Sequence, residues 1–117
     1  MESISIILRR PPYGTVDAPE AIRHALGGIT EDMDISLILT DGGVNAARKG
    51  QGVSNTEYSS VESGIRDCID MGVNVYADKI SIKQELIEVE DLIEGVIIAN
   101  SLEIAEIIEK SDVTMVF

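Results

Sequence analysis

The chain has 117 residues, of which 44% are hydrophobic and only 3% aromatic, so it can bury an aliphatic core in one domain over residues 1–117. Its net charge of −12 argues against direct binding to nucleic acid and against docking on anionic membranes, because both carry negative charge. The acidic surface serves either solubility alone or the binding of a basic protein partner. The apolar runs are too short to span a bilayer, the N-terminus has no signal-peptide pattern and one Cys cannot form an internal disulfide, so we expect a cytoplasmic protein.

The first third of the chain reads as a strand, a loop and a helix. Residues 3–9 are rich in β-branched side chains and predict the first strand. Two prolines in residues 9–15 then favour a loop. Asp17 with Glu20 has the spacing of a capping box, which predicts a helix that Gly27 and Gly28 end or fray.

The middle of the chain repeats this alternation. Residues 34–40 predict a second strand, whose apolar run suits a strand covered on both faces, and residues 44–53 predict a long polar loop. Ser54 with Glu57 forms another capping-box pattern, which predicts a helix to about Met71 that stops at Gly72. The apolar stripe of that helix has core spacing and consists of Val61, Ile65, Cys68 and Ile69.

The last third of the chain predicts three more strands and two more helices. Residues 73–77 predict the third strand, and Ser81 with Gln84 predicts a short helix. Residues 88–94 are acidic and predict a surface loop before a fourth strand at 96–99. Asn100 with Glu103 then caps the last predicted helix, and residues 112–117 predict the fifth strand.

Strands that alternate with helices predict a three-layer α/β/α domain with a five-stranded, mostly parallel sheet and helices on both faces. Because the carboxyl ends of parallel strands meet at one edge, we expect ligands or partners to bind where strands end and helices begin. The candidate ligand- or partner-binding residues at these turns are Tyr13, Gly14, Asp41, Gly42, Tyr76, Ala77 and Asp78.

The turns exclude the common cofactors of such sheets. No GxGxxG or GxxxxGK[ST] motif occurs, so a nucleotide cofactor is not expected. Arg9 and Arg10 stand where a receiver domain needs carboxylates, and only Gly14 and Thr15 fit a flavodoxin-like phosphate loop. Without a Cys/His cluster no metal site is expected either.

Several single residues permit both a structural and a functional interpretation. Cys68 is either a sulfur-carrying nucleophile or a small core residue; its place on the apolar stripe favours the core, and neighbouring carboxylates raise a thiol pKa. His24 is interpreted as a solvated surface residue. Asp41 either forms the turn or orients a ligand. Tyr13 and Tyr76 either line a common pocket or serve packing.

Four segments together resemble the DsrE/DsrF-like sulfur-relay family, and most of all its TusC/DsrF branch. The resemblance spans nearly the whole chain. Its segments are Arg10-Pro11-Pro12-Tyr13-Gly14-Thr15, Thr40-Asp41-Gly42-Gly43-Val44, Glu94-Gly95-Val96-Ile97-Ile98 and Ser111-Asp112-Val113-Thr114-Met115-Val116-Phe117. It implies a DsrEFH-like α/β/α domain, flavodoxin-like in architecture, that assembles into trimers or hexamers with itself or with Cys-bearing DsrE-like paralogues.

The resemblance also implies where the sulfur chemistry belongs. Sulfur-carrying members hold a persulfide on a Cys at the end of the third strand, which corresponds to residues 76–78 here. No Cys stands there, and Cys68 does not match the motif, so a non-catalytic subunit is expected rather than an enzyme. The alternatives are a homo-oligomeric binding protein for a small ligand and a sulfurtransferase that uses Cys68.

Overall fold

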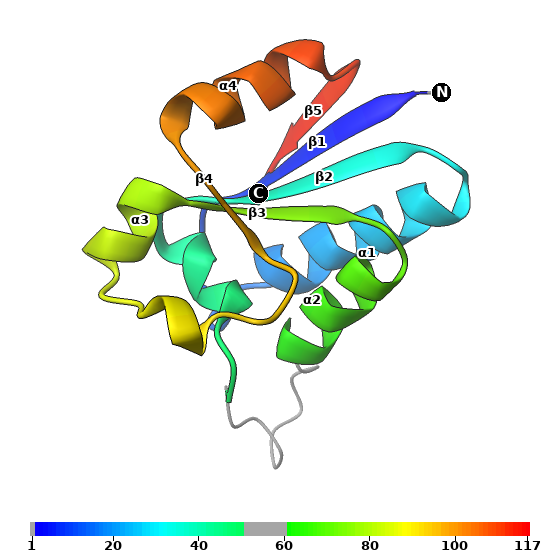
Figure 1. The fold of residues 1–117 in the computed structure, drawn as a ribbon. Coiled ribbons are helices and arrows are strands. Elements are labelled where there is room, and N and C mark those ends of the chain that lie inside the picture. The colour runs from blue at the N-terminus through cyan, green and yellow to red at the C-terminus, as the bar shows by residue number, and fades with distance from the viewer. Residues whose placement is uncertain (1, 51–60) are drawn as a thin grey trace.

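Five parallel strands form one sheet in the computed structural model, which describes residues 2–50 and 61–117 (Figure 1). The strands run in the order β4-β3-β2-β1-β5, and every neighbouring pair is parallel. Their bounds are β1 Ser3–Leu8, β2 Asp34–Leu39, β3 Asn74–Asp78, β4 Ile97–Ala99 and β5 Val113–Val116. The predicted five-stranded parallel sheet is therefore confirmed.

The strand order differs from that of flavodoxin itself, which is 2-1-3-4-5. Here β2, β3 and β4 follow one another on one side of β1, and β5 lies on the other side of β1. The order in which strands are added to the sheet therefore reverses between β1 and β5, and this position is the topological switch point of the sheet. All five strands end at the same edge, which we call the carboxyl edge.

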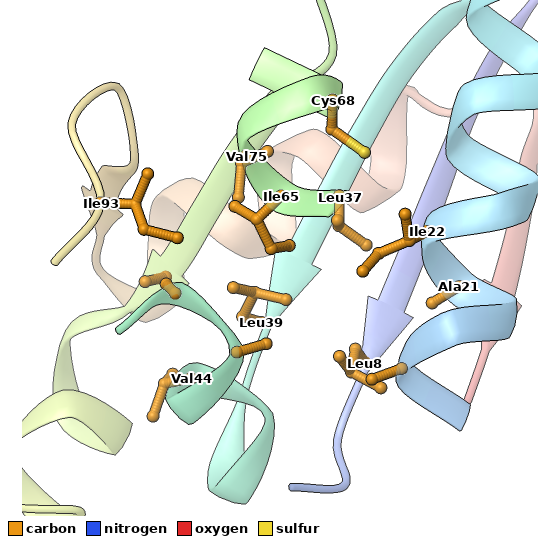
Figure 2. Packing of buried hydrophobic residues seen from close by; sticks show 14 of the residues in the cluster. Leu8, Ala21, Ile22, Leu37, Leu39, Val44, Ile65, Cys68, Val75 and Ile93 are labelled. Carbon is orange, nitrogen blue, oxygen red and sulfur yellow. The ribbon is translucent and has the colours of Figure 1, made fainter. Parts of the chain in front are cut away.

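Helices cover both faces of the sheet, as the alternation predicts (Figure 1). Helices α1 (Asp17–Thr30) and α2 (Val61–Asp70) lie on one face, and α4 (Ser101–Lys110) lies on the other. Strand residues such as Leu8, Leu37 and Val75 point into the larger core under α1 and α2 (Figure 2). A smaller core under α4 is built around Ile38, Ala99 and Ile104.

The face under α4 is more polar than the apolar run of residues 34–40 predicts for a strand buried on both sides. Ser36 and Asn74 line a shallow pocket of about 200 Å³ beside α4. Ser5 is fully buried there and shares a hydrogen bond with the hydroxyl of Ser111, which in turn donates to the carbonyl of Ile107 at 2.8 Å. One helix thus covers this face only in part.

Helix α1 begins and ends differently from the prediction. Its N-cap position is Val16 rather than Asp17, and the Asp17 N–H donates to Thr15 Oγ1 at 3.3 Å. The helix runs through Gly27 and Gly28 to Thr30, because glycine lowers helix stability by only about 1 kcal/mol and does not remove a hydrogen bond. At Gly28 a side chain would collide with Ile35, since a Cβ there would lie 2.6 Å from its Cδ1 atom.

The predicted loop over residues 44–53 was wrong in its first half. Residues Asp41–Ala47 form a 3₁₀ helix, η1, whose small residues Ala46 and Ala47 are buried against the end of the sheet. Residues 48–50 belong to no helix, as predicted, while residues 51–53 and the capping box of Ser54 and Glu57 lie outside the described residues. At the other end of α2, Gly72 has φ of +100°, which fits the predicted C-cap.

The remaining elements match the predicted order. Helix α3 spans Lys79–Gln84, but its N-cap is Asp78 and not Ser81. The acidic segment contains a single 3₁₀ turn, η2, at Val89–Asp91. The capping box of α4 is confirmed, because the Glu103 N–H donates to Asn100 Oδ1 at 2.9 Å and the Asn100 N–H donates to Glu103 Oε1 at 3.1 Å.

Candidate functional site

One chain of hydrogen bonds connects the ends of β2 and β3 at the carboxyl edge. The hydroxyl of Ser81 donates to Asp78 Oδ2 at 2.6 Å and accepts a hydrogen bond of 2.8 Å from the backbone N–H of Asp41. The backbone N–H of Ser81 also donates to Asp78 Oδ2, at 3.2 Å. The turn after β2 is thereby fixed to the first turn of α3.

Local sequence explains why this network forms. Asp78 ends β3 with extended backbone angles, so its carboxylate can cap the first turn of α3. Ser81 stands three residues further on and is only 2% exposed, so its hydroxyl needs partners within the protein. Ser81 was not predicted from the sequence as a site residue. The signal for Ser81 is the Asp-x-x-Ser spacing, which is typical of a helix whose N-cap is Asp78.

Asp41 faces two partners at this edge. Its backbone N–H is bonded to Ser81, while its carboxylate lies 3.6 Å from the Nε atom of Arg9. Both charged side chains are more than 60% exposed, so solvent screens this ion pair and it adds little stability. Asp41 also has a left-handed φ of 50°, which Asp tolerates better than most residues. This geometry agrees with the turn-forming interpretation of Asp41.

The two glycines after Asp41 let η1 approach the end of β1. A Cβ on Gly43 would lie 2.2 Å from the carbonyl oxygen of Leu8, and a Cβ on Gly42 would lie 2.9 Å from the Cγ atom of Pro11. The Gly43 N–H donates to the carbonyl oxygens of Thr40 and Arg9. Glycine is therefore required here by close packing.

Tyr13 and Gly14 belong to the loop that follows β1. Gly14 has φ of +102°, which the turn requires, and half-buried Tyr13 packs on the larger core. Tyr13 also borders an open pocket of about 400 Å³, together with Pro11, Pro12, Asn45, Arg48, Lys49 and Gly50. The backbone holds the two basic residues in place: Arg48 forms an antiparallel bridge with Leu92, and the Lys49 N–H donates to the Asp91 carbonyl at 2.8 Å.

A second pocket of about 370 Å³ lies at the switch point between β1 and β5. It is lined by Arg9, Arg10, Asp41, Val116 and Phe117. In open α/β sheets the crevice at such a reversal is the usual ligand position. Arg10 forms an ion pair there with Asp17 at 3.2 Å. The carboxyl edge therefore combines pockets with much of the chain's limited positive charge.

Tyr76 and Ala77 do not contribute side chains to this edge. Tyr76 packs in the smaller core and borders the pockets beside α4, on the opposite face of the sheet from the core that Tyr13 contacts. The two tyrosines therefore do not line a common pocket. Ala77 is fully buried under α1 and α2. Of the seven candidate residues, the structure gathers Tyr13, Gly14, Asp41, Gly42 and Asp78.

Cys68 lies away from this edge, inside the larger core. Its side chain is fully buried, and Figure 2 shows it in the same packed layer as Leu37 and Ile22. Its carbonyl accepts a hydrogen bond from the N–H of Val73, just before β3 begins, so a strand length of about 15 Å separates it from Asp78. Burial, with a smaller contribution from the charge of Asp67, raises the pKa of the thiol to about 12. Such a thiol is protonated and unreactive at neutral pH.

The described part of the chain contains no group of three or more His, Cys, Asp or Glu side chains arranged to hold a metal ion. None of its helices has the length and apolar character needed to cross a membrane.

His24 is half-exposed, and its Nε2 atom lies 3.9 Å from a carboxylate oxygen of Glu20. The centroids of its ring and the Phe117 ring are 5.5 Å apart. His24 therefore packs beside the end of β5 and does not stand free in solvent.

These features define a class: a parallel α/β protein with pockets at its carboxyl edge and no thiol there. The chain belongs to the DsrE/DsrF-like family, whose sequence profile matches residues 2–117. The family resemblance inferred from the turns is thereby confirmed.

Individual relatives agree with this assignment. The chain is 28% identical over 117 residues to an uncharacterized protein of Methanopyrus kandleri, with 100% of this chain and 95% of that protein covered. It is 30% identical over 87 residues to the intracellular sulfur oxidation protein DsrF of Allochromatium vinosum, a match that covers 74% of this chain and 64% of DsrF.

Two solved structures share the fold. The ychN protein from E. coli superposes with a TM-score of 0.90 at 24% identity, and both chains are covered completely. A protein of unknown function from Methanobacterium thermoautotrophicum superposes with a TM-score of 0.69 at 15% identity, covering 94% of this chain and 91% of that one.

Proposed function

We propose that this protein is a non-catalytic, DsrF-like subunit of a cytoplasmic sulfur-relay complex. Its role is to bind a Cys-bearing DsrE-like partner and to assemble the complex around that partner's thiol. Membership of the DsrE/DsrF-like family supports a role related to sulfur relay, as does the relative named for intracellular sulfur oxidation.

The observation that carries this proposal is the chemistry of the carboxyl edge. Persulfide transfer moves a sulfur atom from a persulfide to an acceptor thiolate, so each station needs an accessible Cys. At the end of β3, where the resemblance puts that Cys, this chain has Tyr76, Ala77 and Asp78. The Asp78 carboxylate is engaged by Ser81, and the single thiol of the chain is buried elsewhere. The thiol must then come from another subunit.

One observation favours a second candidate, a homo-oligomeric protein that binds a small ligand. The pocket of about 400 Å³ beside Tyr13 lies at the edge where such sheets bind ligands, and Arg48 and Lys49 give it positive charge. The third alternative, a sulfurtransferase that uses Cys68, requires the thiol to leave the core and lose its proton. Its burial and its raised pKa both oppose that alternative.

Co-expression with a Cys-bearing DsrE-like paralogue from the same organism tests the proposal. We expect a stable complex by size-exclusion chromatography with light scattering. After treatment with a persulfide donor, mass spectrometry should locate the extra sulfur on the paralogue's Cys and not on Cys68. A protein that stays monomeric at micromolar concentration, with or without the paralogue, would contradict the proposal.

A matched variant separates the alternatives. Cys68→Ser should leave complex formation and sulfur loading of the paralogue unchanged. Stoichiometric sulfur on Cys68, lost together with transfer activity in Cys68→Ser, would establish the sulfurtransferase instead. If the protein forms a homo-oligomer and does not bind the paralogue, the result would favour the second candidate, a homo-oligomeric protein that binds a small ligand.

A further inference from the structure

Leu86 occupies a position that is unfavourable for leucine in two respects. Its side chain is 88% exposed, and its backbone has a left-handed φ of 57°. It follows α3 directly, after the C-cap residue Glu85. The Leu86 N–H donates to the carbonyl of Lys83, and the Ile87 N–H donates to the carbonyl of Ile82. These two bonds define a Schellman motif, in which the position of Leu86 is usually glycine.

The hydrophobic contact of the motif does not involve Leu86. Ile82 and Ile87 are both buried in the larger core and provide that contact. Leu86 therefore brings backbone strain and exposed apolar area without an apolar partner among the described residues. A glycine would form the same turn without either disadvantage, so the leucine side chain itself needs an explanation.

Other exposed apolar side chains lie on α3, on the connection from α3 to β4, on β4 and at the start of α4. We call them the β4-edge surface, and they are Ile80, Leu86, Val89, Ile97 and Leu102. Helices α3 and α4 start after the paired strands β3 and β4, so Ile80 and Leu102 lie at neighbouring helix starts. Leu86 and Val89 lie on the connection from α3 to β4, and Ile97 lies on β4, the outermost strand (Figure 1). These five are the majority of the nine large hydrophobic residues exposed in the described chain.

The charge around this surface indicates what covers it. The segment from Lys79 to Glu103 has two exposed lysines, Lys79 and Lys83, against six exposed carboxylates, which are Glu85, Glu88, Glu90, Asp91, Glu94 and Glu103. Two copies of this chain packed through the surface would bring like charges together and repel each other. A different chain, with lysines or arginines around an apolar pocket, would be attracted instead.

We propose that the β4-edge surface, with Leu86 as its anchor, is the docking site for a basic partner protein. The inference rests on the proposed function and deepens it, because it gives the face on which the Cys-bearing partner binds and the charge that the partner must present. Docking buries Leu86 in the partner's pocket, while the acidic rim orients the approach and excludes a second copy of this chain.

The substitution Leu86→Gly tests the proposal because it should change stability and binding in opposite directions. Glycine accepts the left-handed backbone, so the melting temperature of the isolated protein should rise by a few degrees. Affinity for the purified Cys-bearing paralogue, measured by calorimetry, should fall by about tenfold or more. Affinity of the wild-type protein should also decrease as salt concentration rises. Val113→Ser, at an exposed position on the opposite edge strand β5, is the matched control and should bind like wild type.

Each of the other outcomes would contradict a specific part of the two proposals. If the complex forms and Leu86→Gly binds like wild type, the docking face is wrong and the proposed function stands. If wild type binds no paralogue, both proposals fail. A lower melting temperature of Leu86→Gly would make Leu86 a structural residue. Self-association that Leu86→Gly abolishes, or binding that salt does not weaken, would exclude the basic partner.

Discussion

The backbone N–H of Asp41 donates a hydrogen bond of 2.8 Å to the hydroxyl of Ser81, which stands 40 residues later in the chain. The same hydroxyl donates to Asp78, so one buried side chain fixes the turn after β2 to the start of α3. The carboxyl edge thus has a rigid centre at the place where the family resemblance puts a sulfur-bearing Cys.

Ser81→Ala should destabilise the protein by about 1–3 kcal/mol, because it leaves the N–H of Asp41 without its partner and removes a bond to a carboxylate. Chemical denaturation measures the free energy of unfolding. Ser101→Ala is the matched control, since Ser101 is exposed at the start of α4 and should change stability by less than about 0.5 kcal/mol. Equal effects of both substitutions would show that the network does not contribute.

Gly43→Ala should cost roughly 3 kcal/mol, because the new Cβ would lie 2.2 Å from the carbonyl oxygen of Leu8, a backbone atom that cannot move aside freely. Gly27→Ala should have the opposite sign. Gly27 lies inside α1, and a Cβ added to it would meet nothing within 4 Å, so alanine should stabilise the helix by about 0.5–1 kcal/mol. Thermal unfolding of the two variants compares them directly, and a stable Gly43→Ala protein would refute the close approach of η1 to β1.

The Cys68 thiol should resist iodoacetamide at pH 8 in the folded protein and react readily after unfolding in urea. Its pKa is about 12 when folded, against an ordinary value of 9.0. Between these values unfolding releases a proton, so the contribution of this group to stability is complete below pH 9 and decreases as the pH rises toward 12. Cys68→Ala should have a flatter dependence of stability on pH in that range. Rapid alkylation of the native protein would contradict this burial.

Ile65→Ala should destabilise the protein by roughly 2–5 kcal/mol, because this fully buried side chain of α2 fills the core against the sheet (Figure 2). The comparison is Leu102→Ala on α4, whose side chain is 69% exposed and should matter by less than about 0.5 kcal/mol. Urea unfolding measures the free energy of unfolding of both variants, and the two values can be compared if the dependence on urea concentration (the m-value) is unchanged. A loss near zero for Ile65→Ala would mean that the helix packs by another face.

Local patterns predicted most of the elements because the residues that decide them are close in sequence. The capping box of Asn100 and Glu103 and the apolar stripe of Ile65 and Cys68 both depend on spacings of three or four residues, and both were confirmed. Where contacts with distant residues decide, prediction failed. Gly28 stays helical beside Ile35, and η1 forms where Ala46 and Ala47 are buried by the end of the sheet.

The candidate site was predicted in part, for a similar reason. Alternation of strands and helices places Tyr13, Asp41 and Asp78 at one edge, because parallel strands end together. It cannot tell which face a strand residue takes at the end of the strand, so Tyr76 was grouped with Tyr13 although they pack on opposite faces. Ser81 was interpreted only as a helix cap, since its bond to Asp41 spans 40 residues.

The sequence by itself determined the parallel α/β architecture, the family resemblance and the lack of a thiol at residues 76–78, because composition, short-range periodicity and residue identity suffice for these. Only the tertiary structure decided that Cys68 is sealed in the core, that Ser81 connects Asp41 to Asp78 and that Leu86 projects from a strained turn. Burial, long-range hydrogen bonds and backbone strain depend on how distant segments pack, and no local pattern contains that information.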